Sequence, residues 1–308
     1  MPKTLVILNP ISGNGAANQT WPAIERALRE GGLAFDLART TAPRAAVALA
    51  EQAKGDGYEM LVAVGGDGTV NEVANGMLRA ADGRAAGSLA IIPIGSGNDL
   101  TKTLATKYGW PQAVRCILEG KRRAMDVGKV AGDQPAPGYD AGPHYFLNAL
   151  DTGFGAMVAQ HVHEIPFLRG FPMYLAGVFK TLLNYSVPRV RIALDGNIVE
   201  QRSTMISVAN GRCIGGGFRI APTARIDDGL ADVIIAQGLG RVGILSLLPK
   251  VMQGTHIGDA RVTFVQAAHI TIDSPDPLTV EADGEIPYIG AHHLEIQILP
   301  KHFTLVGP

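Results

Sequence analysis

The chain has 308 residues, of which 46% are hydrophobic and 18% are charged, and its formal net charge is -1. This length accommodates two domains, and the composition is that of a globular protein rather than a disordered one. A charge this close to zero excludes an electrostatic case for nucleic acid as a partner.

Cysteine content and hydropathy bear on the setting of the protein. Cys116 and Cys213 are too few and too far apart to indicate a disulfide framework, which favours a reduced environment. The first residues lack the basic and apolar regions of a signal peptide. No stretch approaches the roughly 18 consecutive apolar residues of a membrane-spanning helix. We therefore expect a cytoplasmic protein, with any membrane contact peripheral and at the inner face.

Short apolar runs alternate with segments of helical spacing in the first part of the chain. The predicted strands are residues 4–8, 35–39, 60–64 and 89–93, and the predicted helices are residues 21–30, 45–53 and 70–78. Strands and helices in alternation predict a parallel α/β sheet. Ligands on such sheets bind beyond the carboxyl ends of the strands. We predict a nucleotide-binding α/β domain over residues 1–125.

From about residue 126 onward, apolar and polar residues alternate in a different rhythm. The predicted strands are residues 187–194, 205–208, 231–236, 270–272 and 294–299. Asp-Gly pairs typical of turns stand at Asp195-Gly196, Asp228-Gly229 and Asp283-Gly284. We predict a β-rich antiparallel sandwich or barrel with one helical excursion over residues 126–297. Residues 298–308 could return to the first domain or pair with the second.

The most informative segment is Gly65-Gly66-Asp67-Gly68-Thr69, between the third predicted strand and its helix. Free backbone amides and the positive end of the helix dipole attract an anion at such a place. Glycine lets the backbone approach a phosphate and adopt positive φ angles. Asp67 adds a carboxylate that could hold a metal ion or a substrate hydroxyl beside the phosphates. The segment therefore predicts a nucleotide-phosphate site with chemistry attached.

Three further loops follow predicted strands and point to the same edge of the sheet. They are Asn9-Pro10-Ile11-Ser12-Gly13, Thr40-Thr41 and Pro93-Ile94-Gly95-Ser96-Gly97-Asn98-Asp99. An ordinary turn would use residues like those of the first loop, and hydroxyls like those of the second commonly cap helices. The loops contain no lysine, which leaves amides and a metal ion to neutralise phosphate charge. The chain lacks a Walker-type Gly-rich motif and a dinucleotide fingerprint.

In order and spacing, these motifs resemble those of the diacylglycerol kinase catalytic-domain family, which includes sphingosine, ceramide and bacterial lipid kinases. The matching segments of the second half are Val208-Ala209-Asn210-Gly211, Gly215-Gly216-Gly217, Ala221-Pro222-x-Ala224, Asp227-Asp228-Gly229-Leu230 and Asp283-Gly284-Glu285. The resemblance covers essentially the whole chain. It implies an NAD kinase-like α/β domain, a β-rich second domain, and a kinase that uses ATP and Mg²⁺ to phosphorylate a hydroxyl of a lipid such as diacylglycerol.

The resemblance also implies roles for single residues. ATP would be lined by Asn9, Pro10, Ile11, Ser12, Gly13, Thr41, Gly65, Gly66, Asp67, Gly68, Thr69, Val70, Asn71 and Ser96. Asp67 and Asp99 would help to hold the phosphates and their Mg²⁺. Glu285 would accept the proton of the lipid hydroxyl, with Asp283 as the second candidate. A structural Mg²⁺ would bind the Asp228 carboxylate and the backbone carbonyls of Arg225 and Leu230.

The lipid side of the predicted activity depends on an apolar segment. Residues 161–185 contain a helix with an apolar stripe, which could admit a lipid tail, touch a bilayer surface or cover the sandwich core. Two alternatives to a lipid kinase stay open: an NAD kinase, whose Gly-Gly-Asp-Gly loop is similar, and a nucleotide- or lipid-binding protein without catalysis. An exposed sheet edge would suit a homodimer. The sequence does not name the lipid.

Overall fold

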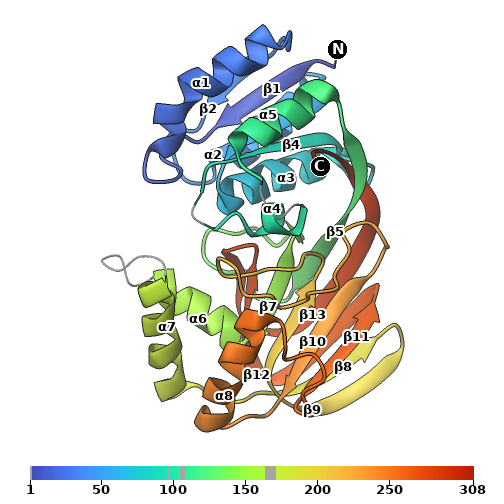
Figure 1. Cartoon of the computed structure of the whole chain (residues 1–308). Coiled ribbons are helices and arrows are strands. Elements are labelled where there is room, and N and C mark those ends of the chain that lie inside the picture. The colour runs from blue at the N-terminus through green and yellow to red at the C-terminus, as the bar shows by residue number, and fades with distance from the viewer. Residues whose placement is uncertain (1, 96, 105–107, 164–170) are drawn as a thin grey trace. The chain divides into compact units, whose positions relative to one another are not determined.

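The structure is a computed structural model that describes residues 2–95, 97–104, 108–163 and 171–308 (Figure 1). The chain divides into two compact units. The first comprises residues 1–127 and 300–308, and the second comprises residues 128–299. The boundary lies two residues beyond the one expected from the sequence.

The first unit is built on a parallel sheet. Its strands are β1 (Thr4–Leu8), β2 (Asp36–Arg39), β3 (Met60–Gly65) and β4 (Gly87–Pro93), in the order β4-β3-β1-β2. Every residue of β1 and β3 is buried, as is typical of parallel strands covered on both faces. Phe303–Val306, at the end of β13 (Glu285–Val306), pairs in parallel with β4. Of the two pairings that the sequence left open for the last strand, the structure has the one with the first unit.

In the described part of this unit there are five helices. They are α1 (Ala16–Glu30), α2 (Ala45–Gly55), α3 (Asp67–Ala81), α4 (Asp99–Leu104) and α5 (Trp110–Glu119). Helices α1 and α5 share one core with the strands, with Trp21, Ile24 and Ile117 among its buried side chains. Helices α2 and α3 pack so closely that a Cβ on Gly76 would lie 2.3 Å from the carbonyl oxygen of Val47. Close helix packing therefore requires glycine inside α3 despite its low helix propensity.

The second unit is β-rich, and its strands pair antiparallel. They are β6 (His144–Phe146), β7 (Ala149–Gly153), β8 (Arg189–Leu194), β9 (Asn197–Ala209), β10 (Ala231–Gln237), β11 (Val262–Ala267), β12 (His269–Ala282), most of β13, and the end of β5 (Arg122–Gly132). Strands β7 and β8 each pair with both β9 and β12. The four strands therefore close into a small antiparallel barrel, filled by Ile192, Val208, Ile272 and their apolar neighbours.

Among the described residues of this unit, the helices are α6 (Phe154–His163), α7 (Phe171–Asn184) and α8 (Arg241–Gln253). The three helices share an apolar cluster that includes Phe154 of α6, Val178 of α7 and Ile244 of α8. The prediction of a single helical excursion is wrong, because α8 forms a second one. Gly243 and Pro249 lie inside α8, and both residue types lower helix propensity. No helix in the described part of the chain is long and apolar enough to cross a bilayer.

Two of the three Asp-Gly pairs form the predicted hairpin turns. Asp195 and Gly196 have φ angles of 46° and 92°, and Asp283 and Gly284 have φ angles of 52° and 92°. Two successive positive φ angles define the tight turn that matches strand twist. Asp228-Gly229 also lies in a turn between two strands, as predicted, but this turn belongs to the long connection between β9 and β10 and joins no hairpin.

Candidate active site

The carboxyl ends of β1, β3 and β4 bring three of the four predicted loops together in the first unit. The Asn9 Nδ2 atom donates to Thr69 Oγ1 at 2.9 Å, and Ser12 Oγ lies 3.4 Å from the same hydroxyl. On the other side, the Ile94 amide donates to the Gly65 carbonyl at 2.8 Å. Because parallel strand ends share one sheet edge, these contacts assemble a continuous polar surface there.

Glycine in the two inner loops is required by close approach. A Cβ on Gly95 would lie 2.5 Å from Gly66 Cα, and a Cβ on Gly65 would lie 2.5 Å from Thr69 Oγ1. The expectation of positive φ angles in the Gly65 segment is not met at Gly66, whose φ is -91°. A positive φ of 61° occurs instead at Gly13, in the loop after β1.

Two carboxylates lie together at the starts of α3 and α4. Helix α3 begins at Asp67, three residues earlier than predicted, so Asp67 occupies its first turn. The Asp99 amide donates to Asp67 Oδ1 at 2.8 Å. A Cβ on Gly97 would lie 2.6 Å from Asp67 Oδ2 and 3.9 Å from Asp99 Oδ2, so both oxygens border the same point. This arrangement fits Mg²⁺, which proteins hold through one or two carboxylates together with substrate phosphates.

A lysine just beyond the predicted loop pairs with this acidic group. Lys102 Nζ lies 2.9 Å from Asp99 Oδ1, one helical turn away. Lys102 was not among the residues predicted from the sequence, because it lies outside the glycine loops. The i,i+3 spacing on α4 was the available signal. The contact places a positive charge at the edge where the loops meet.

The remaining predicted nucleotide-lining residues have different surroundings. Thr41 is exposed after β2, and within the described residues no hydrogen bond joins it to the other three loops. Val70 and Asn71 are buried in α3, where the Asn71 side chain accepts a hydrogen bond from Asn75 Nδ2 at 3.0 Å. Ser96 lies outside the described residues.

Glu285 opens β13 in the second unit, directly after the Asp283-Gly284 turn. Its Oε2 atom accepts a hydrogen bond from the Tyr139 hydroxyl at 2.5 Å. The Tyr139 ring in turn packs edge-on against His144, with centroids 5.8 Å apart. The sequence analysis missed Tyr139, because it lies 146 residues from Glu285 in a loop that carries no motif.

Asp283, the second candidate for the proton acceptor, is hydrogen-bonded to the backbone of a neighbouring segment. Its carboxylate accepts backbone N–H bonds from Leu147 at 2.6 Å, Asn148 at 3.0 Å and Ala149 at 2.9 Å. These bonds fasten the β12–β13 turn to the start of β7.

We expect Asp283→Ala to destabilise the protein by about 3 kcal/mol, because three N–H groups lose their acceptor at about 1 kcal/mol each. Urea unfolding measures this loss. The matched control is Asp195→Ala, since the exposed carboxylate of Asp195 accepts only two N–H bonds, from Ala268 and His269. Equal losses in the two variants would contradict the argument.

The proposed structural metal ligands lie between β9 and β10. Asp228 Oδ1 accepts the Leu230 amide at 3.2 Å, and Arg225 Nε lies 3.5 Å from Asp227 Oδ1. Burial raises the pKa of nearby Asp232, and the charge of Asp228 raises it further. Among the residues that the structure describes, no three or more His, Cys, Asp or Glu side chains gather as a metal site.

A buried carboxyl that the sequence analysis did not single out lies on β7. Asp151 is 3% exposed and stands in register between Ser207 of β9 and Glu281 of β12. Burial raises the pKa of Asp151 to about 6. In the folded protein Asp151 therefore keeps its proton up to about pH 6, whereas an exposed aspartate loses it near pH 4.

This burial predicts a pH-dependent stability that Asp151→Asn removes. At pH values well below the unfolded-state pKa of 3.8, the carboxyl is protonated in both states and the folded state has no burial cost. The cost develops as pH rises to about 6, and the change from 3.8 to about 6 corresponds to about 3 kcal/mol. The stability of the variant relative to the wild type should therefore rise by about this amount between pH 4 and pH 8. Urea unfolding at both pH values tests this, and a pH-independent difference would refute it.

Comparisons with known proteins place the chain in a family. Residues 3–130 match the diacylglycerol kinase catalytic domain, and residues 148–307 match the YegS C-terminal NAD kinase beta sandwich-like domain. The chain belongs to the diacylglycerol kinase catalytic-domain family with a YegS-like C-terminal domain. The family predicted from the motifs is thus confirmed.

Matches to individual relatives cover nearly the full length of this chain and of each relative discussed first. The chain is 25% identical over 314 residues to the diacylglycerol kinase of Bacillus subtilis (strain 168), covering 100% of the chain and 97% of that protein. A Bacillus anthracis str. Sterne protein assigned to the diacylglycerol kinases has a TM-score of 0.79 at 25% identity, covering 100% of this chain and 98% of that chain. Yeast NADH kinase complexed with NADH, at 11% identity and a TM-score of 0.50, covers 100% and 84%. The last likeness concerns the fold alone, and it supports the predicted NAD kinase-like fold class.

Proposed function

We propose that the protein is a lipid kinase that transfers the γ-phosphate of ATP, with Mg²⁺, to a hydroxyl of a lipid such as diacylglycerol. The observation that carries the proposal is the convergence of the Asn9, Asp67 and Asp99 loops at one sheet edge. The family of the chain supports a lipid as the acceptor, and so does its similarity to a Bacillus subtilis protein named diacylglycerol kinase.

The loops after β1, β3 and β4 would bind the nucleotide phosphates. The first turn of α3 offers backbone N–H groups and the positive end of a 15-residue helix dipole. The close approach of Gly66 and Gly95 keeps side chains away from the backbone there. The bond from Asn9 to Thr69 would fix the first loop against that turn.

Asp67 and Asp99 would hold the metal ion, and Lys102 would orient Asp99 and add positive charge. Bound Mg²⁺ would supply charge neutralisation for the phosphate oxygens. Phosphoryl transfer depends mainly on such positioning and electrostatic stabilisation, so a site of amides, carboxylates and one lysine suffices for it.

Glu285 would accept the proton of the lipid hydroxyl as that oxygen attacks phosphorus. Tyr139, through its short hydrogen bond, would position the carboxylate and leave its other oxygen for the acceptor. The three N–H bonds of Asp283 support this choice, because they engage the alternative carboxylate in the fold.

Purified protein incubated with γ-labelled ATP, Mg²⁺ and detergent-dispersed lipids tests the proposal. Label should appear on diacylglycerol or another lipid alcohol, and chromatographic mobility will identify the acceptor. Label on NAD alone would establish the nucleotide-kinase alternative. ATP binding without transfer to any acceptor would establish the binding-protein alternative.

A second, structural Mg²⁺ is proposed at Asp228. Asp228→Ala should release one equivalent of bound Mg²⁺ and lower the unfolding temperature by several degrees, since the ion stabilises only the folded state. Metal analysis after dialysis and thermal unfolding with and without Mg²⁺ measure both effects. Asp227→Ala, at the neighbouring position, is the control and should keep the ion. Equal metal content in the wild type and Asp228→Ala would remove this assignment.

We also propose that the protein meets its lipid at a membrane surface. The end of the predicted apolar segment supports this, because Phe179 and Leu183 of α7 are 53% and 68% exposed. The same helix covers the fold with its other face, through buried Val178 and Leu182. Of the three roles considered for residues 161–185, contact with a bilayer surface and cover for the core are therefore both compatible with the described part of the segment.

A further inference from the structure

The last turn of α7 and the first turn of α8 form one surface of the second unit (Figure 1). Arg241, the first residue of α8, donates to the carbonyls of Leu182 and Leu183 at 2.9 Å each. These bonds satisfy carbonyl groups at the end of α7 that have no partner within the helix. The two helix ends are thereby held side by side.

Apolar side chains are exposed on both helices at this place. Phe179 and Leu183 of α7 are joined there by Val242 and Leu245 of α8, which are 82% and 41% exposed. Neither helix contains an acidic residue over its full length, whereas Lys180, Arg241 and Lys250 are basic. An apolar, acid-free surface of this kind matches the interface of an anionic bilayer.

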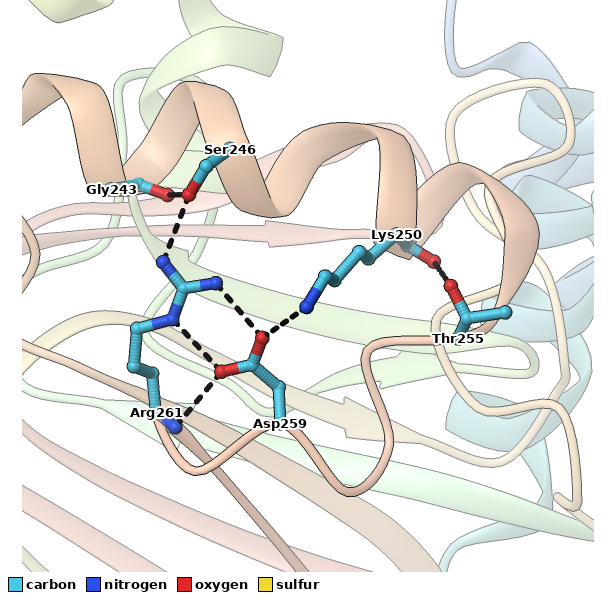
Figure 2. Close-up of polar contacts among 6 residues, drawn as sticks. All are labelled: Gly243, Ser246, Lys250, Thr255, Asp259 and Arg261. Carbon is cyan, nitrogen blue, oxygen red and sulfur yellow. Dashed lines mark hydrogen bonds and ion pairs between the residues drawn. The ribbon is translucent and has the colours of Figure 1, made fainter.

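Helix α8 is also fixed to the fold along its length. Figure 2 shows the carboxylate of Asp259 accepting hydrogen bonds from Lys250 at 2.7 Å and from Arg261 at 2.8 Å, while Arg261 reaches Ser246 at 2.9 Å. The hydrogen bonds from Arg261 and Lys250 hold the pKa of Asp259 far below its usual range. The helix that carries Val242 and Leu245 is therefore bonded through Ser246 and Lys250 to the segment that follows it.

An open hollow of about 600 Å³ between β8, β9 and β12 contains three arginines. Arg191 lies opposite Glu200 in the strand register, and its Nε atom is 3.3 Å from Glu200 Oε1. Its Nη1 atom is 3.7 Å from Asp273 Oδ2. Arg189 instead lies directly opposite Arg202. Like charges in this relation destabilise a strand pair, so two facing arginines indicate a place for an anion.

Arg191 has carboxylate partners for its positive charge, whereas no ion pair among the described residues offsets the charges of Arg189 and Arg202. The Arg189 guanidinium has no hydrogen bond or ion pair there, although the Asp276 carboxylate accepts its backbone amide at 2.9 Å. Arg202 donates only to the Val187 carbonyl, at 3.1 Å. Both guanidinium groups therefore keep donors for a phosphate, whose oxygens suit their planar geometry.

The hollow and the apolar helix ends adjoin each other. Val187 follows α7 in the chain, and Gly238 precedes α8. A Cβ on Gly238 would lie 3.0 Å from Arg202 Cβ and 3.5 Å from the Val187 side chain. The arginine pair thus lies beside the segments that follow α7 and precede α8. We call this region, formed by Arg189 and Arg202 together with the adjoining ends of α7 and α8, the junction.

We propose that this junction binds a bilayer containing anionic phospholipid, with Arg189 and Arg202 taking a headgroup phosphate while Phe179, Leu183, Val242 and Leu245 enter the interfacial layer. The inference deepens the proposed function, since it states how a lipid kinase reaches an acceptor presented in a membrane. None of these residues belongs to the candidate active site.

Flotation of the full-length protein with vesicles, without ATP, tests the inference. Vesicles of phosphatidylcholine are compared with vesicles that also contain phosphatidylglycerol. Arg189→Gln with Arg202→Gln should weaken binding to the anionic vesicles by about 5-fold per arginine. Phe179→Ser with Val242→Ser should weaken binding to both kinds of vesicle. Arg26→Gln with Arg115→Gln, which removes two exposed charges from α1 and α5, should leave binding unchanged.

Further measurements separate this inference from the proposed function. All variants should keep the wild-type unfolding temperature and phosphorylate lipid dispersed in detergent at the wild-type rate. Arginine-dependent vesicle binding without any kinase activity would refute the proposed function and support the junction. Undiminished binding by the arginine variant would overturn the inference, as would stabilisation of the wild type by inorganic phosphate without vesicle binding. Self-association through the apolar residues, seen by light scattering in place of vesicle binding, would also overturn it.

Discussion

Asp67→Asn is expected to lower kcat by about 10³-fold or more without unfolding the protein. The amide oxygen can still accept the Asp99 amide hydrogen, so the contact between the two loops survives. The variant loses the negative charge that would hold Mg²⁺ beside the phosphates, and such charge stabilisation amounts to several kcal/mol. Initial rates with labelled ATP, measured over a range of Mg²⁺ concentrations, report the loss.

The matched control for this substitution is Asp36→Asn in the same unit. Asp36 is exposed and accepts a hydrogen bond from Tyr58 at 2.7 Å, away from the strand ends that carry the loops. Its replacement should leave kcat within about twofold of the wild type, as surface substitutions usually do. Near-normal activity of Asp67→Asn would refute the metal assignment.

Glu285→Gln is expected to lower kcat by about 10² to 10⁴-fold, the range that a positioned general base contributes. Glutamine keeps the shape of the side chain and can accept the Tyr139 hydrogen bond, but it cannot take a proton from the acceptor hydroxyl. The KM for ATP should change little, because the residue would act on the lipid. Rates at saturating ATP with detergent-dispersed lipid measure the effect.

Glu295→Gln is the control on the same strand, at an exposed position. It should have wild-type kcat. Tyr139→Phe should show an intermediate loss in kcat, and it should add little to the loss already caused by Glu285→Gln, since both act on one carboxylate. Additive losses in the double variant would show that Tyr139 acts independently of Glu285.

Local sequence patterns identified the first unit well. Buried parallel strands such as β1 and β3 are continuous apolar runs, so their positions follow from composition alone. The loops after them were recognisable because they combine glycine with polar residues at strand ends. What the pattern did not show was a further reason for glycine at Gly66 and Gly95. There the two backbones pass within contact distance, which only the folded structure reveals.

The second unit was harder to predict because its key contacts join distant residues. Tyr139 meets Glu285 across 146 residues, and Asp283 bonds to a segment about as far away. Helix α8 escaped prediction because its internal glycine and proline weaken the helical signal. Lys102, by contrast, was within reach, since its spacing from Asp99 is a local helical relation.

The pairing of Phe303–Val306 with β4 has a consequence for biosynthesis. These residues are translated after the whole second unit, yet they complete the sheet whose other strands were made first. Until they arrive, β4 is an open edge with unpaired backbone groups, the kind of surface that recruits foreign strands. The sheet of the first unit therefore stays unfinished while the whole second unit is translated.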